Sequence, residues 1–94
     1  MAYQVIIGYL RSYDPSMGDA IAFFDGALGD AVALPGWWER KVSIYQTVEL
    51  AYPDSERLAP GARRGVVHVE SRTRPQQSHE HFKFKLLDAV IHQA

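Results

Sequence analysis

The sequence predicts an α+β fold in which a three-stranded antiparallel sheet is backed by two helices. Three segments have the apolar patterning of strands, namely 2–10, 41–52 and 64–72. Two others, 14–34 and 78–93, carry apolar residues at helical spacing. The expected order is therefore β-α-β-β-α.

The first strand, 2–10, is apolar on both faces, which is typical of a central strand. Gly8 marks a place on this strand where another group approaches closely. The helix that follows is expected to start at Asp14, a good N-cap, with Pro15 at its first position. It is expected to end at Leu34, because the Pro-Gly pair that follows cannot continue it.

One face of the 14–34 helix would be a strip of small residues where surface helices usually carry Lys and Glu. Three glycines in its interior oppose the helix by about 3 kcal/mol in total, so close packing against another backbone should offset them. We expect that contact to be with a second copy of the chain or a protein partner. Packing inside the monomer and a helix break near Gly26 are the alternatives. The predicted interface comprises Gly18, Ala22, Phe23, Gly26, Gly29, Ala33, Trp37 and Trp38.

The adjacent residues Trp37 and Trp38 should point in opposite directions if the backbone there is extended. One of them would then be exposed and could anchor a partner, a ligand or a base. The alternative is that both fill the end of the core beneath the turn.

The second strand, 41–52, alternates regularly between polar and apolar residues. A long loop over 53–63 should join it to the third strand, 64–72, expected to pair antiparallel with the second. The C-terminal segment is ambiguous, because 81–85 alternates like a strand while the longer run to residue 93 has a helical stripe. A helix over 78–93, preceded by a capping box at 73–76, is the interpretation we adopt.

This element order is a ferredoxin-like pattern that lacks its last strand. A sheet without one edge strand can complete itself with a strand from another molecule. The 94 residues suffice for one domain, 1–94, with a modest core, and oligomerisation is a common remedy for small cores.

Composition excludes some classes of protein and site. The chain has no cysteine, so disulfides and thiolate chemistry are excluded, and it has no apolar run long enough to span a membrane. A cytoplasmic protein that acts away from membranes is the expectation. Three basic and eight acidic residues up to Glu56 give −5, and seven basic and three acidic residues beyond it give +4.

Few residues suggest chemistry. His68 and Glu70 would share a strand face, and a histidine beside a carboxylate can act as a general base, although a solvated pair has the same pattern. His79 and His81 do not face each other on a helix, so no metal site is predicted, and no cofactor is expected. The basic C-terminal half could bind nucleic acid, with Trp37, Trp38 or Tyr45 stacking on bases.

The leading functional hypothesis is a small protein-binding or regulatory module that acts through the 14–34 helix, most simply as a homo-oligomer. The second is a cofactor-free enzyme of the dimeric α+β-barrel type, with a pocket between sheet and helices and His68 as its base. The third is a nucleic-acid binder that uses the basic C-terminal half.

Overall fold

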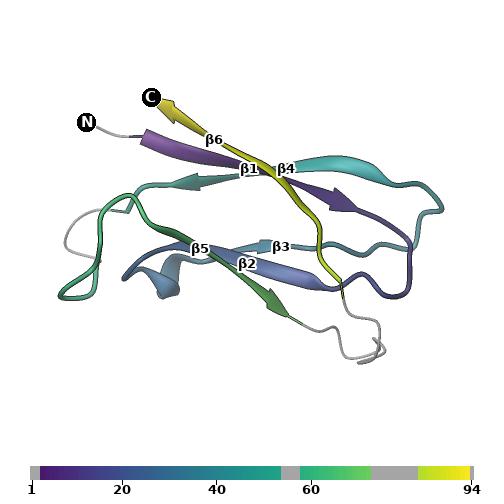
Figure 1. Cartoon of the computed structure of the whole chain (residues 1–94), viewed down its shortest axis with the longest axis horizontal. Helices are drawn as coiled ribbons and strands as arrows, with labels where there is room; N and C mark the ends of the chain where they lie inside the picture. Colours follow the sequence, from purple (N-terminus) through teal and green to yellow (C-terminus); the bar gives the residue numbers. More distant parts are fainter. Residues whose placement is uncertain (1–2, 54–57, 73–82, 94) are drawn as a thin grey trace.

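A computed structural model describes residues 3–53, 58–72 and 83–93, which form two three-stranded antiparallel sheets. In the first sheet, β1 (Tyr3–Arg11) lies between β4 (Ile44–Ala51) and β6 (Leu86–Gln93). In the second, β2 (Asp19–Phe24) lies between β3 (Val32–Leu34) and β5 (Val67–Arg72). The sheets form two layers (Figure 1), so the described chain is a small β-sandwich.

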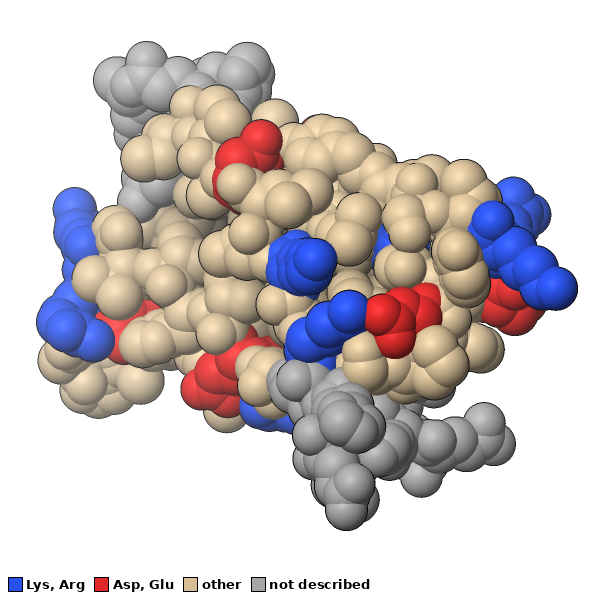
Figure 2. Space-filling view, turned by 45° about the vertical axis from the view of Figure 1, so that its right-hand side comes forward, with Lys and Arg blue, Asp and Glu red and all other residues tan. Residues whose placement is uncertain are grey.

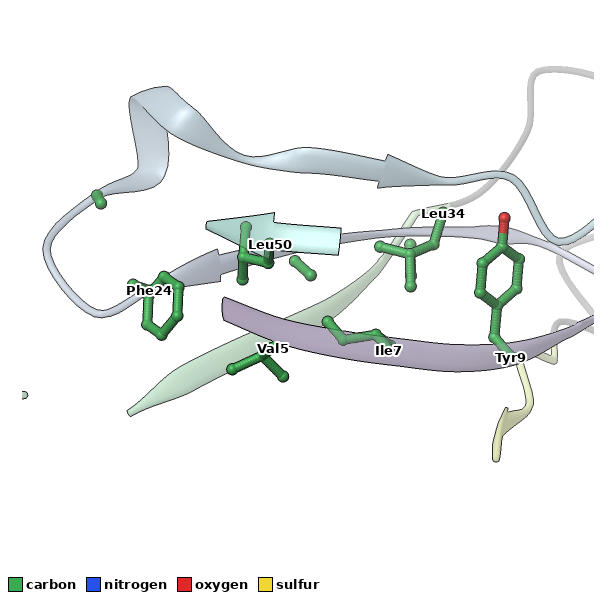
Figure 3. Close-up of a cluster of buried hydrophobic side chains, with 9 residues drawn as sticks. Val5, Ile7, Tyr9, Phe24, Leu34 and Leu50 are labelled. Atoms are coloured by element: carbon green, nitrogen blue, oxygen red, sulfur yellow. The ribbon is translucent and has the colours of Figure 1, made fainter. Parts of the chain in front are cut away.

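The core lies between the two layers and follows the two-residue period of the strands. Val5, Ile7 and Tyr9 point inward from β1, and all three are buried. The remaining members of the cluster come from β2, β3 and β4 and from the segment between β2 and η1 (Figure 3); they are Ala20, Ala22, Phe24, Ala27, Leu34 and Leu50.

The predicted α+β fold is wrong, and so is the ferredoxin-like pattern. Within the described ranges the only helical element is the 3-10 turn η1 (Leu28–Asp30). The segment 14–34 forms a turn, then β2, η1 and β3. The Asp-Pro signal belongs to that turn: Met17 donates its backbone N–H to the Asp14 carbonyl at 3.0 Å, and Ser16 donates to the Asp14 side chain at 2.9 Å.

The glycines explain why no helix forms at 14–34. Gly26 has a φ of +79°, in the left-handed region that favours glycine, and it turns the chain after β2. Before this turn, Ala20, Ala22 and Phe24 alternate inward as a strand requires. The small residues thus lie in a strand and in a turn, so they do not line up along one face of a helix.

The predicted C-terminal helix is wrong over its described part, where residues 86–93 form β6. A register shift opposite Gly8 and Tyr9 leaves Leu87 as an extra residue, a β-bulge. The bulge interrupts the alternation of inward and outward side chains along β6. Because apolar residues occur on both faces of this strand, their spacing in the sequence resembles the apolar stripe of a helix. Residues 78–82 and the capping box at 73–76 lie outside the described residues.

The three predicted strands are confirmed in position, since 2–10, 41–52 and 64–72 correspond to β1, β4 and β5. The expected pairing of the second strand with the third is wrong, because β5 pairs with β2 and β4 pairs with β1. From one described strand to the next, the chain changes sheet each time except between β2 and β3.

Gly8 confirms that another group approaches β1 closely. On the outer face of the first sheet, Tyr45 of β4 donates its hydroxyl to the Asp88 carboxylate of β6 at 2.8 Å. This bond passes over Gly8, where an added Cβ would collide with both side chains. The bond also raises the pKa of the Tyr45 hydroxyl, because the nearby carboxylate disfavours the phenolate.

We predict that Gly8→Ala lowers the free energy of unfolding by about 1–3 kcal/mol, the usual cost of overpacking. Gly29→Ala is the matched control, because an added Cβ there would meet nothing within 4 Å. Urea unfolding monitored by circular dichroism measures both variants. Equal unfolding midpoints for the two would contradict the close approach over Gly8.

Candidate functional site: the open side of the sandwich

An apolar groove of about 490 Å³ lies between the two sheets. Its walls come from β1 and β6 in one sheet and from β2 and β5 in the other. The residues that line it are Val5, Ile7, Phe24, Gly65, Val67, Val69, Leu86, Ala89 and Ile91. All of them are apolar or glycine.

The groove lies on one side of the sandwich because the two sides are closed differently. On one side β3 and β4 are in contact, and Leu34 and Leu50 are buried there. On the other side β5 and β6 each end a sheet and do not pair with each other. Figure 1 looks onto this second side, with β6 crossing in front of β1 and β5 in front of β2. We call this side, comprising β5, β6 and the groove, the open side.

β6 exposes apolar side chains on both of its faces. Its register places Ala89 and Ile91 opposite Ile7 and Val5, so both point inward, yet Ile91 is 72% exposed. Val90 lies opposite Ile6 on the outer face and is 55% exposed. Soluble proteins usually bury such a strand or place charges on it.

Two of the other edge strands, β3 and β5, carry features that discourage pairing with another molecule. β3 is only three residues long. β5 points His68, Glu70 and Arg72 away from the groove, and the last two form an ion pair at 2.8 Å. β6 has no Lys, Arg or Pro; its only charged residue is Asp88, which accepts the hydrogen bond from Tyr45.

His68 and Glu70 are not joined in the structure. His68 Nε2 lies 2.8 Å from Asp25 Oδ1, and its ring stacks on Phe23 at a centroid distance of 5.1 Å. The backbone N–H of Arg63 donates to Asp25 Oδ2 at 2.6 Å. This cluster of Asp25, Arg63, His68 and Phe23 lies on the outer face of the second sheet, and none of its members lines the groove.

The predicted interface residues are spread over several elements and share no common surface. Ala22 and Phe23 are buried in β2, and Gly18 is buried just before it. Gly26 is in the turn after β2, and Gly29 lies in η1. Ala33 is exposed on β3.

Trp37 and Trp38 are both partly exposed, and each donates its indole N–H to a backbone carbonyl. Trp37 donates to Tyr13 at 3.3 Å, and Trp38 donates to Val42 at 2.7 Å. The guanidinium groups of Arg11 and Arg40 lie 5.0 and 5.5 Å from the Trp38 ring. Trp38 is therefore bonded to the loop before β4 and Trp37 to the segment after β1, and neither ring lines the groove.

Basic side chains do not gather into one surface on the face that Figure 2 shows. Lys and Arg atoms occupy several separate places there, with Asp and Glu atoms close to some of them. Among the described residues, Lys83 pairs with Asp14 and Arg63 with Asp25. Folding thus brings some positive charges of the C-terminal half next to negative charges of the N-terminal half.

The exposure of Leu86, Val90 and Ile91 was not predicted from the sequence, because the predicted helix placed these residues on its core stripe. The signal that could have identified them is the composition of LLDAVIHQ, which has one charge and β-branched residues on both faces of a strand. Within the described ranges no helix is long and apolar enough to cross a membrane. The chain matches no protein-family model, and comparisons with curated proteins and with solved structures find no match.

We predict that the Asp25 cluster makes stability depend on pH in acid. The Arg63 N–H bond, followed by the His68 bond, lowers the pKa of Asp25 from 3.8 to about 2. Because the pKa of Asp25 is lower in the folded than in the unfolded chain, the ionised carboxylate stabilises the fold at pH values above the unfolded-state pKa. This stabilisation is lost as the pH falls from about 4 through 2. Wild type should therefore lose more unfolding free energy between pH 5 and pH 2 than Asp25→Asn.

Urea unfolding at each pH measures this difference. Glu49→Gln is the control, since it removes one exposed carboxylate from β4 without touching the cluster. Parallel pH profiles for wild type and Asp25→Asn would exclude the cluster as a source of acid-dependent stability.

Proposed function

We propose that this protein is a small interaction module that binds an extended polypeptide along β6. The observation that carries this proposal is the exposure of apolar side chains on both faces of an edge strand. A polypeptide strand paired with β6 would form hydrogen bonds with the backbone N–H and C=O groups on the edge of β6 that faces away from β1. It would also cover Ile91 on the inner face and Val90 on the outer face.

The groove favours a polypeptide over a small molecule as the ligand. Sites for small molecules combine an apolar pocket with a few polar groups that fix the orientation of the ligand. Here the lining residues contribute no polar side chain. A strand at the edge of β6, by contrast, is oriented by backbone hydrogen bonds and directs alternate side chains into the groove.

The other two hypotheses receive less support. The enzyme hypothesis needs a base in the pocket, whereas His68 lies on the opposite face of β5 and is engaged by Asp25. The nucleic-acid hypothesis needs a continuous basic surface, whereas positive charges are dispersed over the face that Figure 2 shows.

We predict that an eight-residue peptide of alternating Val and Thr, with a fluorophore at one end, binds the wild-type chain. Ile91→Lys should weaken this binding by about tenfold or more, equivalent to about 1.4 kcal/mol, because an inward lysine blocks pairing at an edge. Fluorescence polarisation measures the affinity. Leu28→Lys is the matched control: Leu28 is 59% exposed on η1, away from the open side, so binding should be unchanged.

A second control is the same peptide with alternate amides N-methylated along one edge. It keeps the side chains but cannot form the ladder of hydrogen bonds. Equal binding of the two peptides, or equal binding by Ile91→Lys and Leu28→Lys, would rule out strand pairing at β6.

A further inference from the structure

We propose that the natural occupant of the open side is a second copy of this chain, paired antiparallel through β6 about a two-fold axis at Val90. This inference rests on the proposed function and names the partner. Antiparallel pairing of two identical strands is self-complementary, so it closes as a dimer without leading to a filament.

The alternation of β6 restricts where the axis can lie. Opposite residues in an antiparallel pair share a face. Ala89 points inward and Val90 outward, so an axis midway between them would set an inner residue against an outer one. The axis must therefore pass at a residue. At Asp88 it would place two carboxylates opposite each other, which is unfavourable.

An axis at Val90 avoids these conflicts. It places Val90 opposite its own copy on the outer face and Ala89 opposite Ile91 on the inner face, so a small residue faces a large one twice. The bulge at Leu87 then falls at the end of the pairing, beyond the regular stretch of 88–92. An axis at Ala89 would bring the bulge within two residues of the centre and leave only 88–90 regularly paired.

This symmetry would complete the core as well as the sheet. A two-fold axis perpendicular to the sheet keeps the inner face of one copy continuous with the inner face of the other. The two open sides then face each other, and the inward residues that each copy leaves exposed, Leu86, Val69 and Ile91, are brought toward a shared interior. The pocket of each copy is thus half of a core that the second copy closes.

The open side has the dimensions that a stable dimer needs. It is the broad side seen in Figure 1, and the molecule measures 41 × 25 × 15 Å along its principal axes. Along it, eight residues of β6 extend over about 27 Å at about 3.4 Å per residue. A standard interface buries about 800 Å² per partner, which a side of this extent can supply.

The chain lacks cysteine, so a single engineered cysteine tests the axis directly. Residues opposite each other in a ladder have Cα atoms about 4.5–5.5 Å apart, within the range for a disulfide. Val90→Cys should therefore crosslink to a dimer under mild oxidation about tenfold or more faster than Val42→Cys, the difference that about 1.4 kcal/mol of pre-association gives. Val42 is a matched control because it is 48% exposed and precedes β4.

Sedimentation equilibrium of the full chain supplies the second measurement. Wild type and Leu28→Lys should be dimers, and Ile91→Lys should be a folded monomer with an unchanged circular dichroism spectrum. A monomeric wild type, a dimeric Ile91→Lys, or equal crosslinking rates for Val90→Cys and Val42→Cys would each overturn the dimer proposed here.

These results separate the inference from the proposed function. A monomeric wild type that binds the Val-Thr peptide refutes the second copy and keeps strand binding at β6. A monomeric wild type that does not bind the peptide refutes both. A dimer that Ile91→Lys dissociates and Val90→Cys crosslinks supports both. Because its second copy competes with the peptide for β6, peptide binding is then compared at concentrations below the dissociation constant of the dimer.

Discussion

The packing of β1 against β2 is the interaction on which the rest of this structure depends. β1 is the central strand of its sheet, and its inward residues Val5, Ile7 and Tyr9 meet the inward residues of β2. Two of those in β2 are the alanines Ala20 and Ala22, which are almost fully buried and allow the layers to approach. Because each sheet has three strands among the described residues, this contact leaves one strand on either side to close the core.

The two sides of the sandwich cover the core to different extents. Leu34 of β3 and Leu50 of β4 are buried where those strands meet, so that side is sealed. On the opposite side the inward residues of β5 and β6 line a groove and do not fill it. The exposed apolar strand β6 and the groove are therefore consequences of the same incomplete closure, and one partner strand would resolve both.

The sequence predicted three strands because their alternation is local, as in 41–52. It did not predict the fold, because four of the five strand connections cross between sheets and no local pattern reports such pairings. Asp14-Pro15 and the glycines that follow occur at turns as readily as at the ends of a helix. Three glycines destabilise a helix but not a turn. In β6 a bulge at Leu87 masked the two-residue period. The groove residues come from four strands, so only the tertiary structure brings them together.

Pairing of β6 with a partner strand can be measured by amide hydrogen exchange at several protein concentrations. If two copies pair through β6, exchange of its amides should slow as concentration rises. The amides of β4, the other edge strand of the same sheet, should exchange at a constant rate. Exchange in β6 that is independent of concentration, or protection that rises equally in both strands, would contradict the account.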